Sequence, residues 1–206
     1  MNFRKSVWNI GLFHGFARAL FYATTFFWAV YFNALGLSGV QIGIITAVYS
    51  LTGFITIIPS GFLNDKIKSK NLITLALLLM ATQCLGISFI HSFVGILVFT
   101  AIGGIGANLY TTSMDSLFYK SMEKHDVTRR IAIFQGINYL FIGLAAILGG
   151  RILNSSENMA EIFQTLIRIT GSGYILFAIL SSILPGSVTT NFEFIKYKSD
   201  IFQPKV

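Results

Sequence analysis

The chain has 206 residues, of which 54% are hydrophobic and 11% are charged, and its formal net charge is +7. This apolar surface exceeds what a soluble core of that length can bury, so the composition excludes an ordinary soluble domain. The basic charge does not indicate nucleic-acid binding, because no basic stripe or RNA-binding motif accompanies it.

Six apolar runs are each long enough to cross a bilayer as a helix, which takes about 20 residues. We predict spans at residues 7–35, 40–60, 72–90, 94–118, 131–153 and 166–184. Strands would leave open edges in lipid, and the alternating pattern of a barrel wall is missing. The first run is not a secretion signal, since it is too long and five more runs follow. The sequence therefore predicts an all-α membrane protein, with residues 1–187 forming one bundle.

Basic residues lie mainly on one side of the predicted spans. Twelve of the 15 lysines and arginines precede the first span or follow the second, fourth and sixth: Arg4, Lys5, Lys66, Lys68, Lys70, Lys120, Lys124, Arg129, Arg130, Lys196, Lys198 and Lys205. Short loops rich in Lys and Arg stay in the cytoplasm. We therefore expect a multi-pass protein of the plasma membrane with both termini cytoplasmic.

A dense run of charge, residues 61–70, follows the second span. Gly61, Asp65, Lys66 and Lys70 fall on the pattern Gly-x-x-x-Asp-(Arg/Lys)-x-Gly-(Arg/Lys)-(Arg/Lys), from which Lys68 and the next residue, a serine, depart. This segment resembles the signature loop between the second and third helices of the major facilitator superfamily. We expect Gly61 to let the backbone leave the helix and Asp65 to lie at the start of the next one. The segment is then a conformational latch, or alternatively a loop that only sets the topology.

The resemblance implies one six-helix bundle of a secondary transporter that moves a small solute by alternating access. Residues 188–206 resemble the start of the cytoplasmic linker to a second six-helix bundle, which another chain, self-association or a longer parent would supply. A constant offset of 89 residues pairs the first three spans with the last three. Because three is odd, such a 3+3 repeat must be inverted in the membrane. The implied partners are the lipid bilayer, a small-molecule solute and a coupling proton or ion, with no cofactor.

The first span carries the clearest candidates for a solute path. His14, Arg18, Tyr22 and Thr25 share one helical face, and Arg18 lies about 11 residues into the span. A buried Arg at that depth costs about 2.5–3.5 kcal/mol on insertion scales, so it should face a wet cavity or a carboxylate. Alternatively, Arg18 has only a structural role and tethers the ends of neighbouring helices. His14 could carry a proton, or it could be a satisfied histidine.

Later spans add candidate polar groups. Asn108 on the fourth span and Gln135 and Asn138 on the fifth are uncharged candidates for the cavity wall. Near the predicted cytoplasmic end, Asp115 is expected to pair with Lys66 or Arg130, forming a charge cluster that stabilises one state of the transport cycle. The resemblance implies that the first, second, fourth and fifth spans line the cavity.

An enzymatic role is not expected. The three histidines lie on different segments, and the chain contains neither a metal-binding HExxH pattern nor a phosphate-cradling glycine loop. Cys84 is the only cysteine, so the sequence offers no internal disulfide and no Cys-based metal site. A six-span channel, a non-catalytic membrane scaffold and an inactive truncated transporter remain alternatives to transport.

Overall fold

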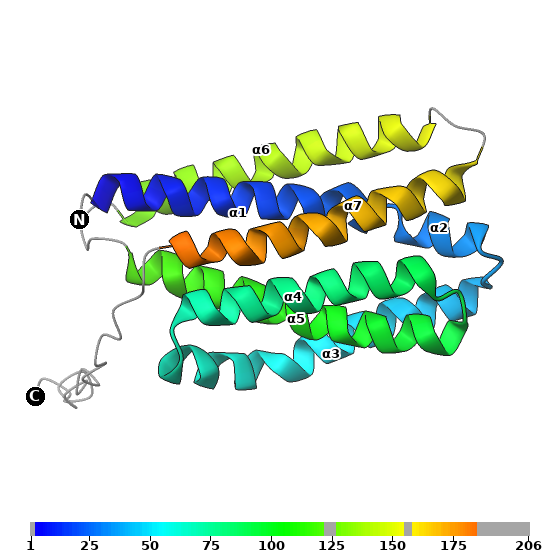
Figure 1. Cartoon of the computed structure of the whole chain (residues 1–206). Coiled ribbons are helices and arrows are strands. Elements are labelled where there is room, and N and C mark those ends of the chain that lie inside the picture. Colours follow the sequence, from blue (N-terminus) through cyan, green and yellow to red (C-terminus); the bar gives the residue numbers. More distant parts are fainter. Residues whose placement is uncertain (1–2, 122–126, 155–157, 185–206) are drawn as a thin grey trace, which may run out of the picture.

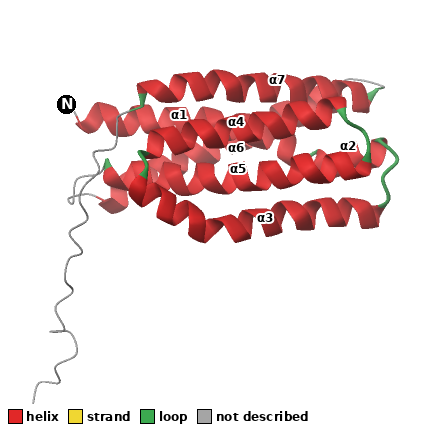
Figure 2. Ribbon diagram, turned by 60° about the horizontal axis from the view of Figure 1, so that its bottom comes forward, coloured by secondary structure: helices red, strands yellow, loops and turns green. Residues whose placement is uncertain are grey.

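A computed structural model describes residues 3–121, 127–154 and 158–184, and all of its regular secondary structure there is helical. The helices run side by side along one common direction (Figure 1). Short loops join them, and no strand occurs in the described ranges (Figure 2). The elements are α1 (Phe3–Thr25), α2 (Trp28–Ala34), α3 (Gly39–Lys66), α4 (Ser69–Phe89), α5 (Phe93–Lys120), α6 (Val127–Asn154), α7 (Met159–Leu180) and the 3-10 turn η1 (Ser181–Ile183).

The expected all-α membrane architecture is confirmed. Five helices, α3 to α7, are long and apolar enough to cross a membrane. Helix α1 has 23 residues and lies alongside the others (Figure 1), but Asn9, His14 and Arg18 make it less apolar. Of these three polar residues, His14 is buried and Arg18 is half-buried, whereas Asn9 is exposed. The segment 188–206, predicted to be a linker, lies outside the described residues.

The first predicted span is broken near its far end. Helix α1 stops at Thr25, and α2 begins at Trp28 after a two-residue turn. The hydroxyls of Thr24 and Thr25 both donate to the carbonyl oxygen of Phe21, at 3.2 and 2.6 Å. Such side-chain bonds compete with the helical ladder, which accounts for a break at this point.

The six long helices pack as two related sets of three, with α3, α4 and α5 in one set and α1, α6 and α7 in the other. Helix α4 packs along α5 and α7, α3 packs on α5, and α6 packs on α1, which in turn reaches α7. Exchanging α1 with α5, α3 with α6 and α4 with α7 maps these contacts onto one another. The helix starts Phe3 and Phe93, Gly39 and Val127, and Ser69 and Met159 differ by 88 to 90 residues. The inverted repeat predicted from the offset is therefore present in the fold.

The two sets meet where α4 crosses α7. Gly171 of α7 lies so close to α4 that a Cβ there would stand 2.9 Å from Leu85 and 3.2 Å from Cys84. The hydroxyls of Thr74 and Ser181 share a hydrogen bond of 2.5 Å across the same interface. Small residues and polar bonds are the means by which helices associate in lipid, where no hydrophobic drive brings them together.

The expected loop at residues 61–70 is mostly helix, so two predicted placements are wrong. Helix α3 continues through Gly61 to Lys66, and only residues 67–68 separate it from α4. Asp65 therefore lies in the last turn of α3 and not at the start of α4. In lipid every backbone group needs an internal partner, so the helix persists until its lysines can reach the headgroups. Gly61 is exposed, and a Cβ there would meet no atom within 4 Å.

Helices α1 and α6 approach each other closely at Gly149. A Cβ at this position would lie 2.8 Å from the carbonyl oxygen of Ala23 and 3.0 Å from the Phe27 ring. We predict that Gly149→Ala lowers the thermal unfolding midpoint in detergent, because overpacking costs about 1–3 kcal/mol. Reaction of a thiol-specific dye with the buried Cys84 reports unfolding.

Gly136→Ala is the matched control on the same helix, since a Cβ there would meet nothing within 4 Å. This variant should unfold at the wild-type temperature or above it, because alanine is the better helix former. Equal midpoints for the two variants would contradict the close approach at Gly149.

Candidate functional site

A cavity of about 400 Å³, here called the central cavity, lies in the middle of the bundle. Helices α1, α3 and α5 form its walls, while Leu77 and Met80 of α4 and Tyr174 of α7 also line it. Phe54 and Ile57 at its α3 side are exposed, so the cavity opens on that face of the bundle. Residues of the third and sixth predicted spans therefore line the cavity together with residues of the first, second and fourth.

Arg18 of α1 lines this cavity. Its Nη2 donates to the hydroxyl of Tyr22 at 3.2 Å, and the guanidinium lies 5.0 Å from the centre of that ring. Its Nε is buried and has no hydrogen-bond partner among the described residues. The guanidinium therefore keeps at least one donor that no described protein group uses.

Two further polar atoms on the same cavity lack partners in the described residues. They are the Oδ1 of Asn108 on α5 and the hydroxyl of Tyr49 on α3. Buried polar groups in proteins are nearly always hydrogen-bonded, so unpartnered ones need an explanation. Together with Arg18 they place a cationic donor, a hydroxyl and an acceptor around one space, which suits a polar ligand.

His14 lies behind the cavity wall. Its Nδ1 shares a 3.2 Å hydrogen bond with the hydroxyl of Tyr110, a residue that does line the cavity. The imidazole stacks on Tyr110 and Phe134, with ring centres 5.7 and 4.9 Å apart, and is only 4% exposed. His14 thereby joins α1 to α5 and α6, the arrangement of a satisfied histidine. Its proposed part in proton coupling stays a prediction.

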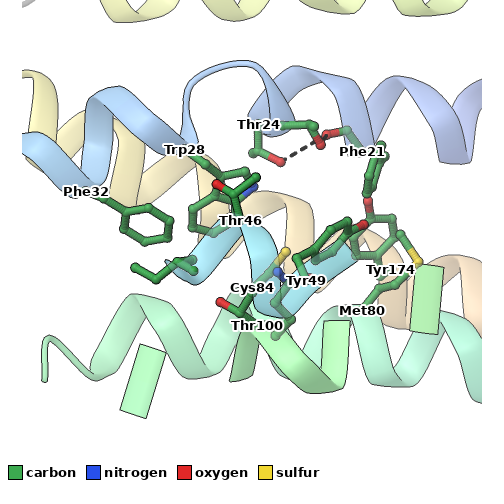
Figure 3. A pocket seen from close by; sticks show the side chains of 13 residues that line it. Phe21, Thr24, Trp28, Phe32, Thr46, Tyr49, Met80, Cys84, Thr100 and Tyr174 are labelled. Atoms are coloured by element: carbon green, nitrogen blue, oxygen red, sulfur yellow. Dashed lines mark hydrogen bonds between the residues drawn. The ribbon is translucent and has the colours of Figure 1, made fainter. Parts of the chain in front are cut away.

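The other predicted path residues are spread over three places. Tyr22 lies against Arg18, and Thr25 lines a second, smaller cavity near the break between α1 and α2. Figure 3 shows this smaller cavity, with Thr24 and Trp28 among its labelled residues. Gln135 and Asn138 lie on α6, where the amide of Asn138 donates to Oε1 of Gln135 at 3.4 Å. Neither of these two residues lines the central or the smaller cavity.

The predicted latch residues gather at one end of the bundle, without the expected ion pair. Asp65 and Lys66 are exposed, and Lys70 is half-buried in the first turn of α4. Within the described ranges no ion pair joins the half-buried Asp115 to Lys66 or Arg130; Arg130 is itself half-buried near the start of α6.

A different contact ties the helices together at this end. Nζ of Lys120, at the end of α5, donates to the carbonyl oxygen of Asn64 at 3.1 Å. Asn64 is 5% exposed, and its side-chain amide donates to the carbonyl oxygen of Ser60 at 2.9 Å. Sequence reasoning assigned Lys120 only to the topology and did not single out Asn64.

Sequence reasoning also missed Tyr49, which lines the central cavity from α3. Tyr49, Thr52 and Thr56 recur three or four residues apart, so they lie on one face of that helix, and all three are half-buried. This polar stripe in an apolar run was a usable signal that the face packs inside the protein.

Within the described residues, no group of His, Cys, Asp and Glu could hold a metal ion.

The bond and stacking around His14 should stabilise the bundle. We predict that His14→Ala lowers the unfolding midpoint more than His14→Phe does. Alanine removes the ring stacking and leaves the Tyr110 hydroxyl unpaired, whereas phenylalanine keeps a ring and loses only the bond, a cost of about 1–3 kcal/mol. Cys84 labelling during heating measures both variants. A His14→Phe variant as stable as the wild type would show that the bond contributes nothing.

Comparisons with known proteins agree with this architecture. The family model of the Major Facilitator Superfamily matches residues 7–194. The chain is 26% identical over 165 residues to the quinolone resistance protein NorA of Staphylococcus aureus strain MRSA252, and equally so to the proteins of that name from strains Mu50 / ATCC 700699 and N315. The aligned region covers 80% of this chain and 42% of each relative, so the chain spans less than half the length of these relatives. The resemblance inferred from residues 61–70 is thereby confirmed: the chain is a multi-pass membrane protein that belongs to the Major Facilitator Superfamily, a family of solute transporters.

Proposed function

We propose that this chain moves a small solute across the plasma membrane by alternating access, as the N-terminal bundle of a secondary transporter. The family match and the 3+3 inverted repeat support this proposal. Inverted repeats are the means by which many transporters build two alternating states. A second six-helix bundle, from another chain, a second copy or a longer parent, would close the other side of the path. The role is transport and not catalysis.

The observation that carries the proposal is the set of unpartnered polar atoms in the central cavity. Nε of Arg18 and Oδ1 of Asn108 are buried there with no partner among the described residues. A fixed cation inside the membrane is expensive and usually marks a substrate or ion pathway. In this proposal Arg18 holds an anionic group of the solute, or an acid that the second bundle supplies, while Asn108 accepts a hydrogen bond from the same ligand.

The relatives suggest a first solute to test. They are named quinolone resistance proteins, and a quinolone carries a carboxylate on a flat ring system. The cavity offers chemistry for both parts, with Arg18 for the carboxylate and the rings of Phe21, Tyr49 and Tyr110 for the flat system. Thr25, Gln135 and Asn138 would contribute to the path as the helices move, and His14 would carry a coupling proton.

The basic end of the bundle is proposed to be cytoplasmic and to form the latch. Helix α1 begins and α7 ends at this end (Figure 1), and the Lys120 bond to Asn64 holds α5 to α3 there. Asp65 and Lys66 remain exposed, so a second bundle could contact them. Residues Gly61, Lys70, Asp115 and Arg130 complete the proposed latch, with the charge pairs forming in another state of the cycle.

We predict that Arg18→Ala abolishes transport in the complete transporter, while expression and unfolding temperature stay close to wild type. The variant loses the cation that binds the solute, so accumulation of a fluorescent quinolone in cells should approach that of cells without the protein. Arg18→Lys should recover only part of the activity, because a lysine lacks the forked donors of an arginine.

Arg168→Ala is the control, since Arg168 is exposed on α7 and stacks on Phe89 away from both cavities. This variant should transport at the wild-type rate. Unchanged transport by Arg18→Ala would assign Arg18 to a structural role and remove the main support for the proposal.

A further inference from the structure

The smaller cavity, here called the aromatic cavity, has a volume of about 140 Å³. It lies toward the α2 end of the bundle and shares Phe21, Tyr49, Met80 and Tyr174 with the central cavity. These four side chains therefore form a wall between the two spaces. Figure 3 shows Trp28 and Phe32 on one side of the aromatic cavity and Tyr49 and Tyr174 on the other.

Several polar groups that line the aromatic cavity, the Tyr174 hydroxyl among them, form no hydrogen bond with a described group. The hydroxyl oxygen of Thr100, a residue 3% exposed, has no hydrogen-bond partner among the described residues, and the same holds for the hydroxyl of Tyr49. No described group forms a hydrogen bond with the carboxamide of Gln83, which is 9% exposed. The other threonine hydroxyls around the cavity already donate to carbonyl oxygens of their own helices: those of Thr24, Thr25 and Thr46.

The fold makes room for one of these groups. A Cβ at Gly103 of α5 would overlap the carboxamide of Gln83, which comes from α4. The absence of a side chain at Gly103 thus lets that carboxamide lie between the two helices beside Thr100. The packing of α4 against α5 therefore fixes the position of the polar groups on this side of the cavity.

The chemistry of the lining selects the class of ligand. None of the residues that line the aromatic cavity carries a charge, so a charged group there would be buried without a counter-ion, which is costly. Phe21, Trp28 and Phe32 supply ring faces and edges, against which another ring packs well. An engineered apolar cavity of about 150 Å³ binds benzene, so a single six-membered ring fits the volume.

We propose that the aromatic cavity is a binding subsite for a neutral aromatic ring that bears one hydroxyl group, as in a phenol. The ring would pack against Trp28 and Phe32, and its hydroxyl would bond to Thr100 and Gln83. This inference deepens the proposed function and rests on it in one respect: the transported solute would place its anionic part at Arg18 and a phenol-like ring beyond the Tyr49 wall. Binding of the ring itself does not depend on transport.

Fluorine NMR of 4-fluorophenol with the full purified chain in detergent tests this subsite. Saturable binding is expected, together with slower dye labelling of Cys84, which also lines the cavity. Thr100→Val keeps the volume and removes the hydroxyl, so it should weaken 4-fluorophenol binding about tenfold, the usual effect of one lost hydrogen bond. The same variant should bind fluorobenzene as well as the wild type does. Gln83→Met removes the other proposed hydrogen-bond partner at a similar volume, and serves as the second variant should Thr100→Val fold poorly.

Thr82→Val is the matched control, because Thr82 is exposed on α4 outside both cavities. It should leave the binding of both compounds unchanged. Thr100→Leu fills the space and should abolish both. Equal signals in all variants would indicate partition into the micelle, and no saturable binding would indicate a cavity that takes only water; either result would overturn the inference.

The two proposals fail separately. Loss of phenol binding with intact transport of a quinolone would reject the subsite alone. Saturable phenol binding that Thr100→Val weakens, in a complete transporter that moves no solute, would reject the transport function and leave the subsite standing.

Discussion

The cost of placing Arg18 inside a membrane is the constraint on which the rest of the structure depends. Lipid offers neither water nor counter-ions, so the guanidinium must find its partners within the bundle. Tyr22 supplies one hydrogen bond and a ring face, and the central cavity supplies space for more. The helices around Arg18 therefore cannot close into a solid core, and the same demand that makes the residue expensive keeps a polar space open in the middle of an apolar protein.

The bundle holds together around that space through close contacts and polar bonds. Gly149 lets α6 approach the backbone of α1, Gly171 lets α7 approach α4, and the bonds of His14 to Tyr110 and of Thr74 to Ser181 cross between the two sets of helices. These close contacts and polar bonds are specific in geometry, so they fix how the helices lie against one another.

The spans and the repeat followed from the sequence because lipid fixes both the length of a helix and the cost of a charge. The 89-residue offset predicted the paired helix starts, and the depth of Arg18 in its span was enough to single out this residue, which lines the central cavity. Side-chain packing between helices carries no such periodic signal. The break after Thr25, the helical state of Gly61 and the placement of Gln83 over Gly103 depend on which surfaces meet, so they emerged only from the structure. Tyr49 is the exception, since the polar stripe on its helix was visible in the sequence.

Water access to the middle of the bundle tests this account most directly. Single cysteines are placed at Ala107 and Ile105 in a Cys84→Ala background, two residues apart on α5, where Ala107 lines the central cavity and Ile105 is exposed on the outer surface. The account predicts that a small charged, membrane-impermeant thiol reagent modifies the cysteine at 107 in intact membranes and leaves the one at 105 unmodified. Modification at 105 but not at 107 would show that the centre of the bundle is dry, and would contradict a polar solute path beside Arg18.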